Sequence, residues 1–110
     1  MFGKKQQAVA GELNVDDLSP LLVGSSEFVR LWAKQDGPVT CLIDPTVVGP
    51  DPLLFGIAIM DCIRHGAKAY EQAVSVSEEH ALQRILEGFD AERAKPTDTP
   101  QQIISGSTLQ

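Results

Sequence analysis

Two short runs between residues 27 and 44 have the hydrophobic character of β-strands. Residues 27–34 and 39–44 are rich in β-branched and aromatic side chains, and each run is too short for a convincing helix. Between them lies Asp36-Gly37, a dipeptide that accepts the positive φ angles of the tight primed turn that joins two antiparallel strands. The pattern therefore predicts an antiparallel β-hairpin.

A two-residue turn at Asp36-Gly37 would also determine how the strands pair. It predicts three cross-strand pairs, which are Lys34 with Val39, Trp32 with Cys41, and Arg30 with Ile43. On this register both faces of the hairpin mix polar and apolar side chains. Because a two-stranded sheet is not stable alone in water, we expect helices on one face and a subunit or the N-terminal segment on the other.

Two segments after the hairpin have helical periodicity. Asp51 followed by Pro52 is a typical helix start, because aspartate caps free N–H groups and proline is tolerated in the first turn. The first helix is therefore predicted to extend to about Ala73. The run Ser75-Val76-Ser77-Glu78 matches the capping-box pattern and predicts a second helix that ends near Ala94.

The first predicted helix has one apolar and one charged side. At 100° per residue, the apolar side collects Phe55, Ile59, Ile63, Ala67 and Tyr70. The charged side collects Asp61, Arg64, His65, Lys68, Glu71 and Gln72. Leu53, Leu54 and Ile57 fall on the charged side one or two turns earlier, so we expect them to form an exposed apolar patch at an oligomer interface.

Two further stripes indicate how the helices pack. Small residues of the first helix, Cys62, Gly66, Ala69 and Ala73, would let another helix approach closely. The apolar stripe of the second helix consists of Ala81, Leu82, Ile85, Leu86 and Phe89. The sequence thus predicts one α+β domain over residues 27–95, of order β-β-α-α, dimeric with an extended sheet.

The ends of the chain differ in character from this domain. Residues 1–26 are predicted to be a mobile lead with one short anchoring segment at residues 18–23, and residues 96–110 an extended or disordered tail.

Composition argues against several classes of function. Fifteen acidic against nine basic residues give a net charge of −6, which repels a nucleic-acid backbone. The longest nearly apolar stretch, residues 53–60, is far shorter than a membrane-spanning helix. With no apolar segment typical of a secretion signal, we expect a cytoplasmic protein with reduced cysteines.

Candidate chemistry centres on one helix face. Asp61 and His65 are four residues apart, a spacing at which a carboxylate can orient an imidazole for acid–base work. Solvated ion pairing with the neighbouring cations is the simpler interpretation of this face. The candidate ligand-binding residues are Arg30, Trp32, Arg64 and Lys68.

No metal or cofactor is predicted. Four potential zinc ligands, Cys41, Cys62, His65 and His80, have spacings that match no finger or ribbon pattern. Cys62 is predicted to be buried and inert because it falls within the small-residue stripe. The sequence contains no phosphate loop, dinucleotide-binding turn or nucleophile elbow.

Three stretches together resemble a family of small proteobacterial proteins classed as a domain of unknown function. They are Phe28-Val29-Arg30-Leu31-Trp32, Asp61-Cys62-Ile63-Arg64-His65, and Phe89-Asp90-Ala91-Glu92 with the later Pro96-Thr97-Asp98-Thr99-Pro100. The resemblance covers about residues 27–100. It implies a small bacterial protein and supplies no catalytic residues.

The function predicted from these observations is a non-catalytic interaction or accessory module that forms a homodimer. This prediction is motivated by apolar surface in excess of what one hairpin and two helices can hide. The alternative is a small-molecule-binding protein or weak enzyme that uses His65 and Asp61. An unidentified protein partner in place of a second copy is also compatible with the sequence.

Overall fold

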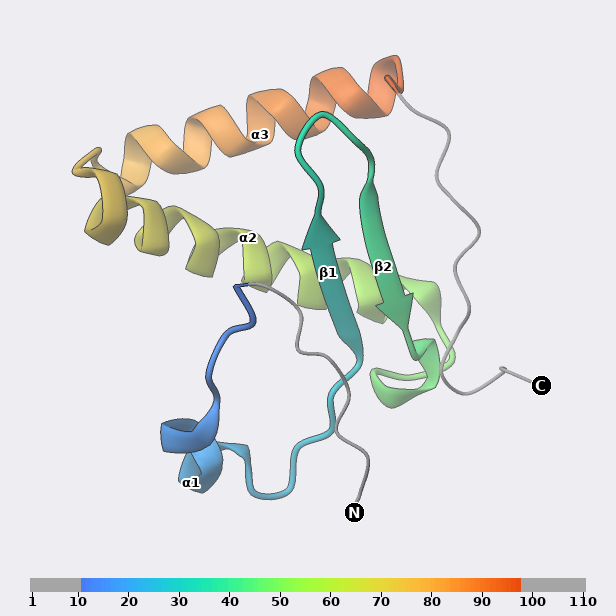
Figure 1. Ribbon diagram of the computed structural model, residues 1–110. Coiled ribbons are helices and arrows are strands. Elements are labelled where there is room, and N and C mark those ends of the chain that lie inside the picture. The colour runs from blue at the N-terminus through green and yellow to red at the C-terminus, as the bar shows by residue number, and fades with distance from the viewer. Residues whose placement is uncertain (1–10, 98–110) are drawn as a thin grey trace.

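The computed structural model describes residues 11–97 and contains a hairpin followed by two helices (Figure 1). The hairpin comprises β1 (Val29–Ala33) and β2 (Val39–Ile43), and the helices are α2 (Pro52–Val74) and α3 (Glu78–Ala94). Short helical turns precede them: η1 (Asp16–Leu18), α1 (Ser19–Leu22) and, between β2 and α2, η2 (Pro45–Val47). The predicted α+β fold of order β-β-α-α is confirmed.

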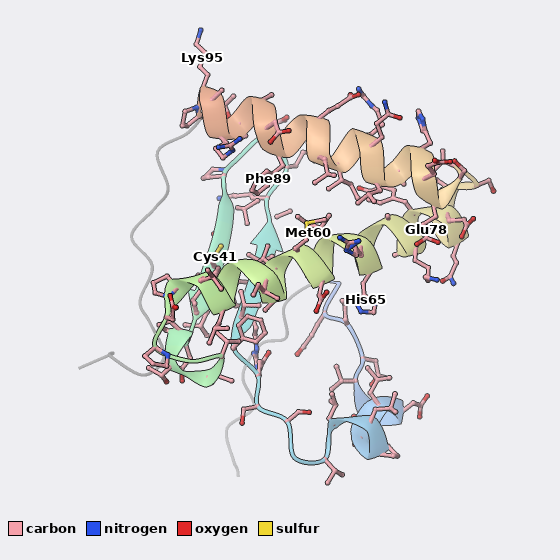
Figure 2. All side chains as sticks on the ribbon, turned by 180° about the vertical axis from the view of Figure 1, so that it is seen from behind. Cys41, Met60, His65, Glu78, Phe89 and Lys95 are labelled. Atoms are coloured by element: carbon pink, nitrogen blue, oxygen red, sulfur yellow. The ribbon has the colours of Figure 1, made fainter. Side chains whose placement is uncertain are left out.

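Both helices lie on the same side of the hairpin. In Figure 1, α2 passes behind the two strands and α3 returns antiparallel to it, and Figure 2 shows the helices in front when the molecule is turned. The first turns of α2 emerge beside β2, whereas α1 stands apart on the side of β1. One contact between the layers is the edge-to-face pair of Phe28 and Phe55, whose ring centroids are 6.1 Å apart.

The predicted strand register is wrong by one residue. Val29 pairs with Ile43, Leu31 with Cys41 and Ala33 with Val39, while Arg30 and Trp32 pair with Leu42 and Thr40. Residues of equal parity therefore share a face, and one face becomes entirely apolar. Its members are Val29, Leu31, Ala33, Val39, Cys41 and Ile43.

The conformation of the turn explains why the observed register differs from the predicted one. A primed two-residue turn needs positive φ at both central residues, but Asp36 alone of this pair adopts it, with φ 57°. The amide of Gly37 instead donates to the carbonyl of Lys34 at 3.0 Å, so Asp36 occupies the third position of a turn that spans Lys34 to Gly37. The ladder then begins with the pair Ala33 and Val39, whereas the prediction paired Lys34 with Val39.

The ends of the helices follow local capping chemistry. The Asp51 carboxylate accepts a hydrogen bond from the Leu53 amide at 3.0 Å, and Pro52 is the first residue of α2, as predicted. The capping-box prediction at Ser75 is wrong, because Ser75 ends α2 with φ 62°. Ser77 caps α3 instead, and its hydroxyl accepts from the His80 amide at 3.1 Å.

The contact between α2 and α3 is made by small side chains. Ala67 is 1% exposed and Ala81 is 5% exposed, and they are the only buried hydrophobic residues among those described. A β-carbon on Gly66 would lie 3.9 Å from Cδ1 of Ile85, an ordinary van der Waals distance. The helices therefore approach closely at Gly66 and Ala67, whereas the other members of the predicted small-residue stripe, Cys62, Ala69 and Ala73, are exposed.

Two residues predicted to face the core lie largely in solvent. Tyr70 on α2 and Phe89 on α3 are 54% and 49% exposed, although the rest of each apolar stripe is at least half-buried. Figure 2 shows Phe89 and Met60 on the facing sides of the two helices. The two helices diverge toward the end of α3, so the apolar stripe of α3 is only partly covered at Phe89 (Figure 1).

The segment before the hairpin lies between two glycines in the left-handed region, Gly11 with φ 76° and Gly24 with φ 80°. Its large apolar side chains, among them Leu18, Leu21 and Val23, are exposed.

The predicted C-terminal tail lies outside the described residues after Thr97, as does the lead before Gly11. No helix within residues 11–97 combines the length and apolar character needed to cross a bilayer.

Candidate interaction surface

The charged side of α2 is exposed and carries no assembled acid–base pair. Asp61, Arg64, His65 and Lys68 all lie at the surface. Within residues 11–97 the only ion pair formed by this set joins Lys68 Nζ to Glu78 Oε1, at the start of α3, over 3.8 Å. Asp61 and His65 share a helix face as predicted, but no hydrogen bond in the described part of the chain links them.

The potential zinc ligands are not brought together. No group of three or more His, Cys, Asp or Glu side chains in residues 11–97 has metal-binding geometry. Both cysteines are free thiols. Cys41 is half-buried on the hairpin, and the predicted burial of Cys62 is wrong because that side chain is exposed on α2.

Arg30 is already engaged within the chain. Its Nε donates to Glu27 Oε2 at 2.6 Å and its terminal nitrogen donates to Glu27 Oε1 at 2.8 Å, which makes a bidentate pair. The hydrogen bond from Arg30 lowers the pKa of Glu27, and the same bond raises the pKa of Arg30. Trp32 lies half-buried on the same face of the hairpin, two residues further on.

Leu53, Leu54 and Ile57 form an exposed apolar surface, here called the α2 patch. Their exposed fractions are 63%, 41% and 55%, in accordance with their predicted position on the charged side of the helix. Leu54 also lies against Gly49, in the loop that follows β2. The α2 patch is therefore adjacent to the end of the hairpin.

An open apolar hollow of about 300 Å³ lies at this same junction. Its walls are Ile43, Pro45, Gly49, Pro50, Pro52 and Phe55. No titratable side chain lines it, so its chemistry suits an aliphatic side chain. A second hollow is lined only by consecutive residues 12–16 of the N-terminal segment.

Comparison with known proteins places the chain in a family. The family model for a domain of unknown function, DUF5076, matches residues 23–97. The chain belongs to the DUF5076 family. The match begins after α1 and includes the hairpin, both long helices and the α2 patch.

One solved structure resembles this DUF5076 chain over nearly its whole length. It is a protein from the photosynthetic bacterium Rhodopseudomonas palustrus CGA009 that is provisionally named a pyruvate dehydrogenase. The two share 30% sequence identity with a TM-score of 0.59, over 93% of this chain and 96% of the other. No curated protein matches the chain.

For this DUF5076 domain, sequence reasoning located the exposed patch and missed its surroundings. The hollow depends on how the loop 45–50 folds back on Phe55, and no periodic pattern reports that. The Glu27–Arg30 pair had a visible signal in its spacing of three residues, but that spacing brings side chains together in helices and not in extended chains. Here Glu27 lies outside β1, two residues before the strand begins, and its carboxylate meets the Arg30 side chain.

Proposed function

We propose that this protein is a non-catalytic interaction module that acts as a homodimer. The observation that carries the proposal is the scarcity of buried side chains in residues 11–97. Only two alanines are buried there, and no large side chain is fully buried, in a chain that is 43% hydrophobic. A soluble monomer ordinarily hides its large aliphatic side chains, so the exposed ones indicate a surface that a partner covers.

The α2 patch is central to this surface. Burying a leucine or isoleucine completely stabilises by about 1.5–3 kcal/mol, so the exposed halves of the patch on two copies contribute on the order of 5–9 kcal/mol. Association itself costs roughly 4–15 kcal/mol in lost freedom. The α2 patch therefore supports a dimer only together with adjoining apolar surface, which the hollow and β2 provide.

The proposal does not take over the activity in the name of the R. palustrus protein. Neither hollow gathers chemistry-bearing side chains from different elements, since one is apolar and the other is formed by a single short segment. The exposed Asp61 and His65 do not converge on either hollow. The apolar surface has the stronger physical support.

The test is absolute mass by light scattering after size exclusion, over a wide dilution series. The wild-type chain should run at twice 11.9 kDa and dissociate on dilution. Ile57→Glu should give folded monomer, because it places a carboxylate in the apolar contact. Gln72→Glu is the matched control, since it adds a negative charge to the same side of α2 without removing apolar surface, and it should remain dimeric.

Two results would contradict the proposal. A wild-type monomer at every concentration would mean that the α2 patch meets a different protein or no protein. An Ile57→Glu variant with undiminished dimer mass would eliminate the α2 patch as the contact.

A further inference from the structure

We propose that β2 is the joint between the two copies, and that it pairs antiparallel with β2 of a second copy about a two-fold axis at Cys41. This inference rests on the proposed homodimer and names the surface that forms it. The occupant of the β2 edge is thus a second copy of this chain. The result is one continuous four-stranded sheet, β1-β2-β2-β1.

The backbone of β2 presents the groups that such a joint requires. The amide of Asp44 donates to the carbonyl of Phe28 at 2.9 Å, which makes this a hydrogen-bonded pair of the hairpin. Because such pairs alternate along an antiparallel ladder, Arg30–Leu42 and Trp32–Thr40 are also hydrogen-bonded pairs. The N–H and C=O groups of Val39, Cys41 and Ile43 consequently point away from β1. Within residues 11–97 the sheet has only two strands, so no third strand satisfies them.

Symmetry leaves one register with full overlap. Residues with outward backbone groups must oppose one another, and only pairing Cys41 with the partner's Cys41 uses all five residues of β2. Val39 then opposes the partner's Ile43, and Thr40 opposes the partner's Leu42. This arrangement adds about six backbone hydrogen bonds and converts two marginal hairpins into one larger sheet.

The side chains favour β2 over β1 as the joint. β2 reads Val-Thr-Cys-Leu-Ile and contains no charge, glycine or proline, the residues with which exposed edges are usually protected. β1 contains Arg30, which is held by Glu27 and feels the charge of Glu12, and the N-terminal segment lies on that side (Figure 1). For a chain of net charge −6, an uncharged joint also avoids repulsion between identical copies.

Neighbouring apolar surfaces extend the joint. Ile43 lines the hollow, so the partner's Val39, which opposes Ile43, lies beside that hollow. The first turns of α2, with the α2 patch, emerge on the same side of the hairpin as β2 (Figure 1). Two copies of this combined surface face each other across the two-fold axis.

A pair of lysine variants tests the edge. Val39 and Leu31 lie on the same face of the hairpin and are 51% and 58% exposed, but they belong to opposite edges. Val39→Lys should weaken the dimer at least tenfold, whereas Leu31→Lys should leave the mass unchanged. Circular dichroism and a thermal melt verify that both variants are folded.

The two cysteines test the register. Directly opposed residues in a hydrogen-bonded antiparallel pair have Cα atoms about 5.5 Å apart, which lies within the range of a disulfide. Copper–phenanthroline oxidation of the Cys62→Ser variant, which retains Cys41, should give covalent dimer on a non-reducing gel. The Cys41→Ser variant, which retains exposed Cys62, should stay monomeric on the gel.

The outcomes separate this inference from the homodimer itself. A wild-type chain that is dimeric by light scattering, but cross-links through Cys62 and not Cys41, would retain the homodimer and overturn the β2 joint. A dimer that is dissociated by Leu31→Lys and not by Val39→Lys would assign the joint to β1. A monomeric wild-type chain would overturn both proposals.

Discussion

Gly49 and Leu54 approach each other so closely that a β-carbon on the glycine would lie 2.7 Å from Cδ1 of the leucine. Gly49 also has φ 125°, a conformation that is essentially restricted to glycine. This single position lets the loop after β2 turn back onto the start of α2. It thereby shapes both the apolar hollow and one margin of the α2 patch.

Replacing Gly49 with alanine should therefore destabilise the protein by about 1–3 kcal/mol. The measurement is the free energy of unfolding in urea, at one fixed protein concentration because association contributes to it. Gly88→Ala is the matched control: Gly88 lies in α3 with open space around it and should gain about 0.5–1 kcal/mol. Equal effects of the two changes would contradict the close approach.

The cap of α2 predicts a second effect on stability. Asp51→Ala removes the acceptor of the Leu53 amide and should cost about 1 kcal/mol in the same urea experiment. Asp51→Asn retains a side-chain oxygen and should come close to the wild-type value. If the alanine and asparagine variants are equally unstable, the cap contributes nothing.

The contact between α2 and α3 predicts intolerance of larger side chains. Ala67→Leu adds three carbons where the helices meet and should destabilise by about 1–3 kcal/mol. Ala69→Leu makes the same change two residues later at an exposed position, and its effect should stay within about 0.5 kcal/mol. Thermal melts that shift alike for both variants would show that the helices do not pack at Ala67.

The hydrogen bonds at the end of α3 predict a lowered pKa for the Glu92 carboxyl group. The backbone amide and the hydroxyl of Thr97 both donate to Glu92 Oε2 at 2.7 Å, and they lower the pKa of Glu92 from its ordinary value of 4.5, the amide more than the hydroxyl. Because the folded pKa is the lower one, the stabilisation is present above the unfolded pKa and disappears as pH falls through the folded value.

Carbon-detected NMR titration of the Glu92 carboxyl group measures this shift directly. Thr97→Val retains the amide donor and should return the pKa part of the way toward 4.5. Thr97→Pro removes both donors and should return it further. A Glu92 that titrates identically in all three chains would contradict the hydrogen bonds.

Local signals in the sequence predicted the elements, and long-range geometry decided the details. Asp51-Pro52 located the start of α2 because a cap and a first-turn proline act within a few residues. The register of the hairpin depended instead on whether Asp36 alone or both Asp36 and Gly37 adopt positive φ. Both options satisfy the local chemistry of an Asp-Gly turn, and they differ in which side chains share a face.

The candidate surface was also predictable only in part. Helical spacing placed Leu53 and Ile57 outside the core, and their exposure confirms this. The hollow beside them could not be predicted, because it arises where Pro45, Pro50 and Phe55 meet across a loop. Phe89 was assigned to the core because periodicity reports the direction of a side chain but not how closely the neighbouring helix lies to it.

The burial of only two methyl side chains has a calorimetric consequence. The heat-capacity change on unfolding is set mainly by the apolar area that becomes hydrated. In a single copy, Ala67 and Ala81 are the only fully covered hydrophobic residues among those described, so part of its apolar area is already hydrated before it unfolds. The heat-capacity increment of this protein should therefore rise with protein concentration, because the unfolding of a dimer also hydrates the apolar area between the copies.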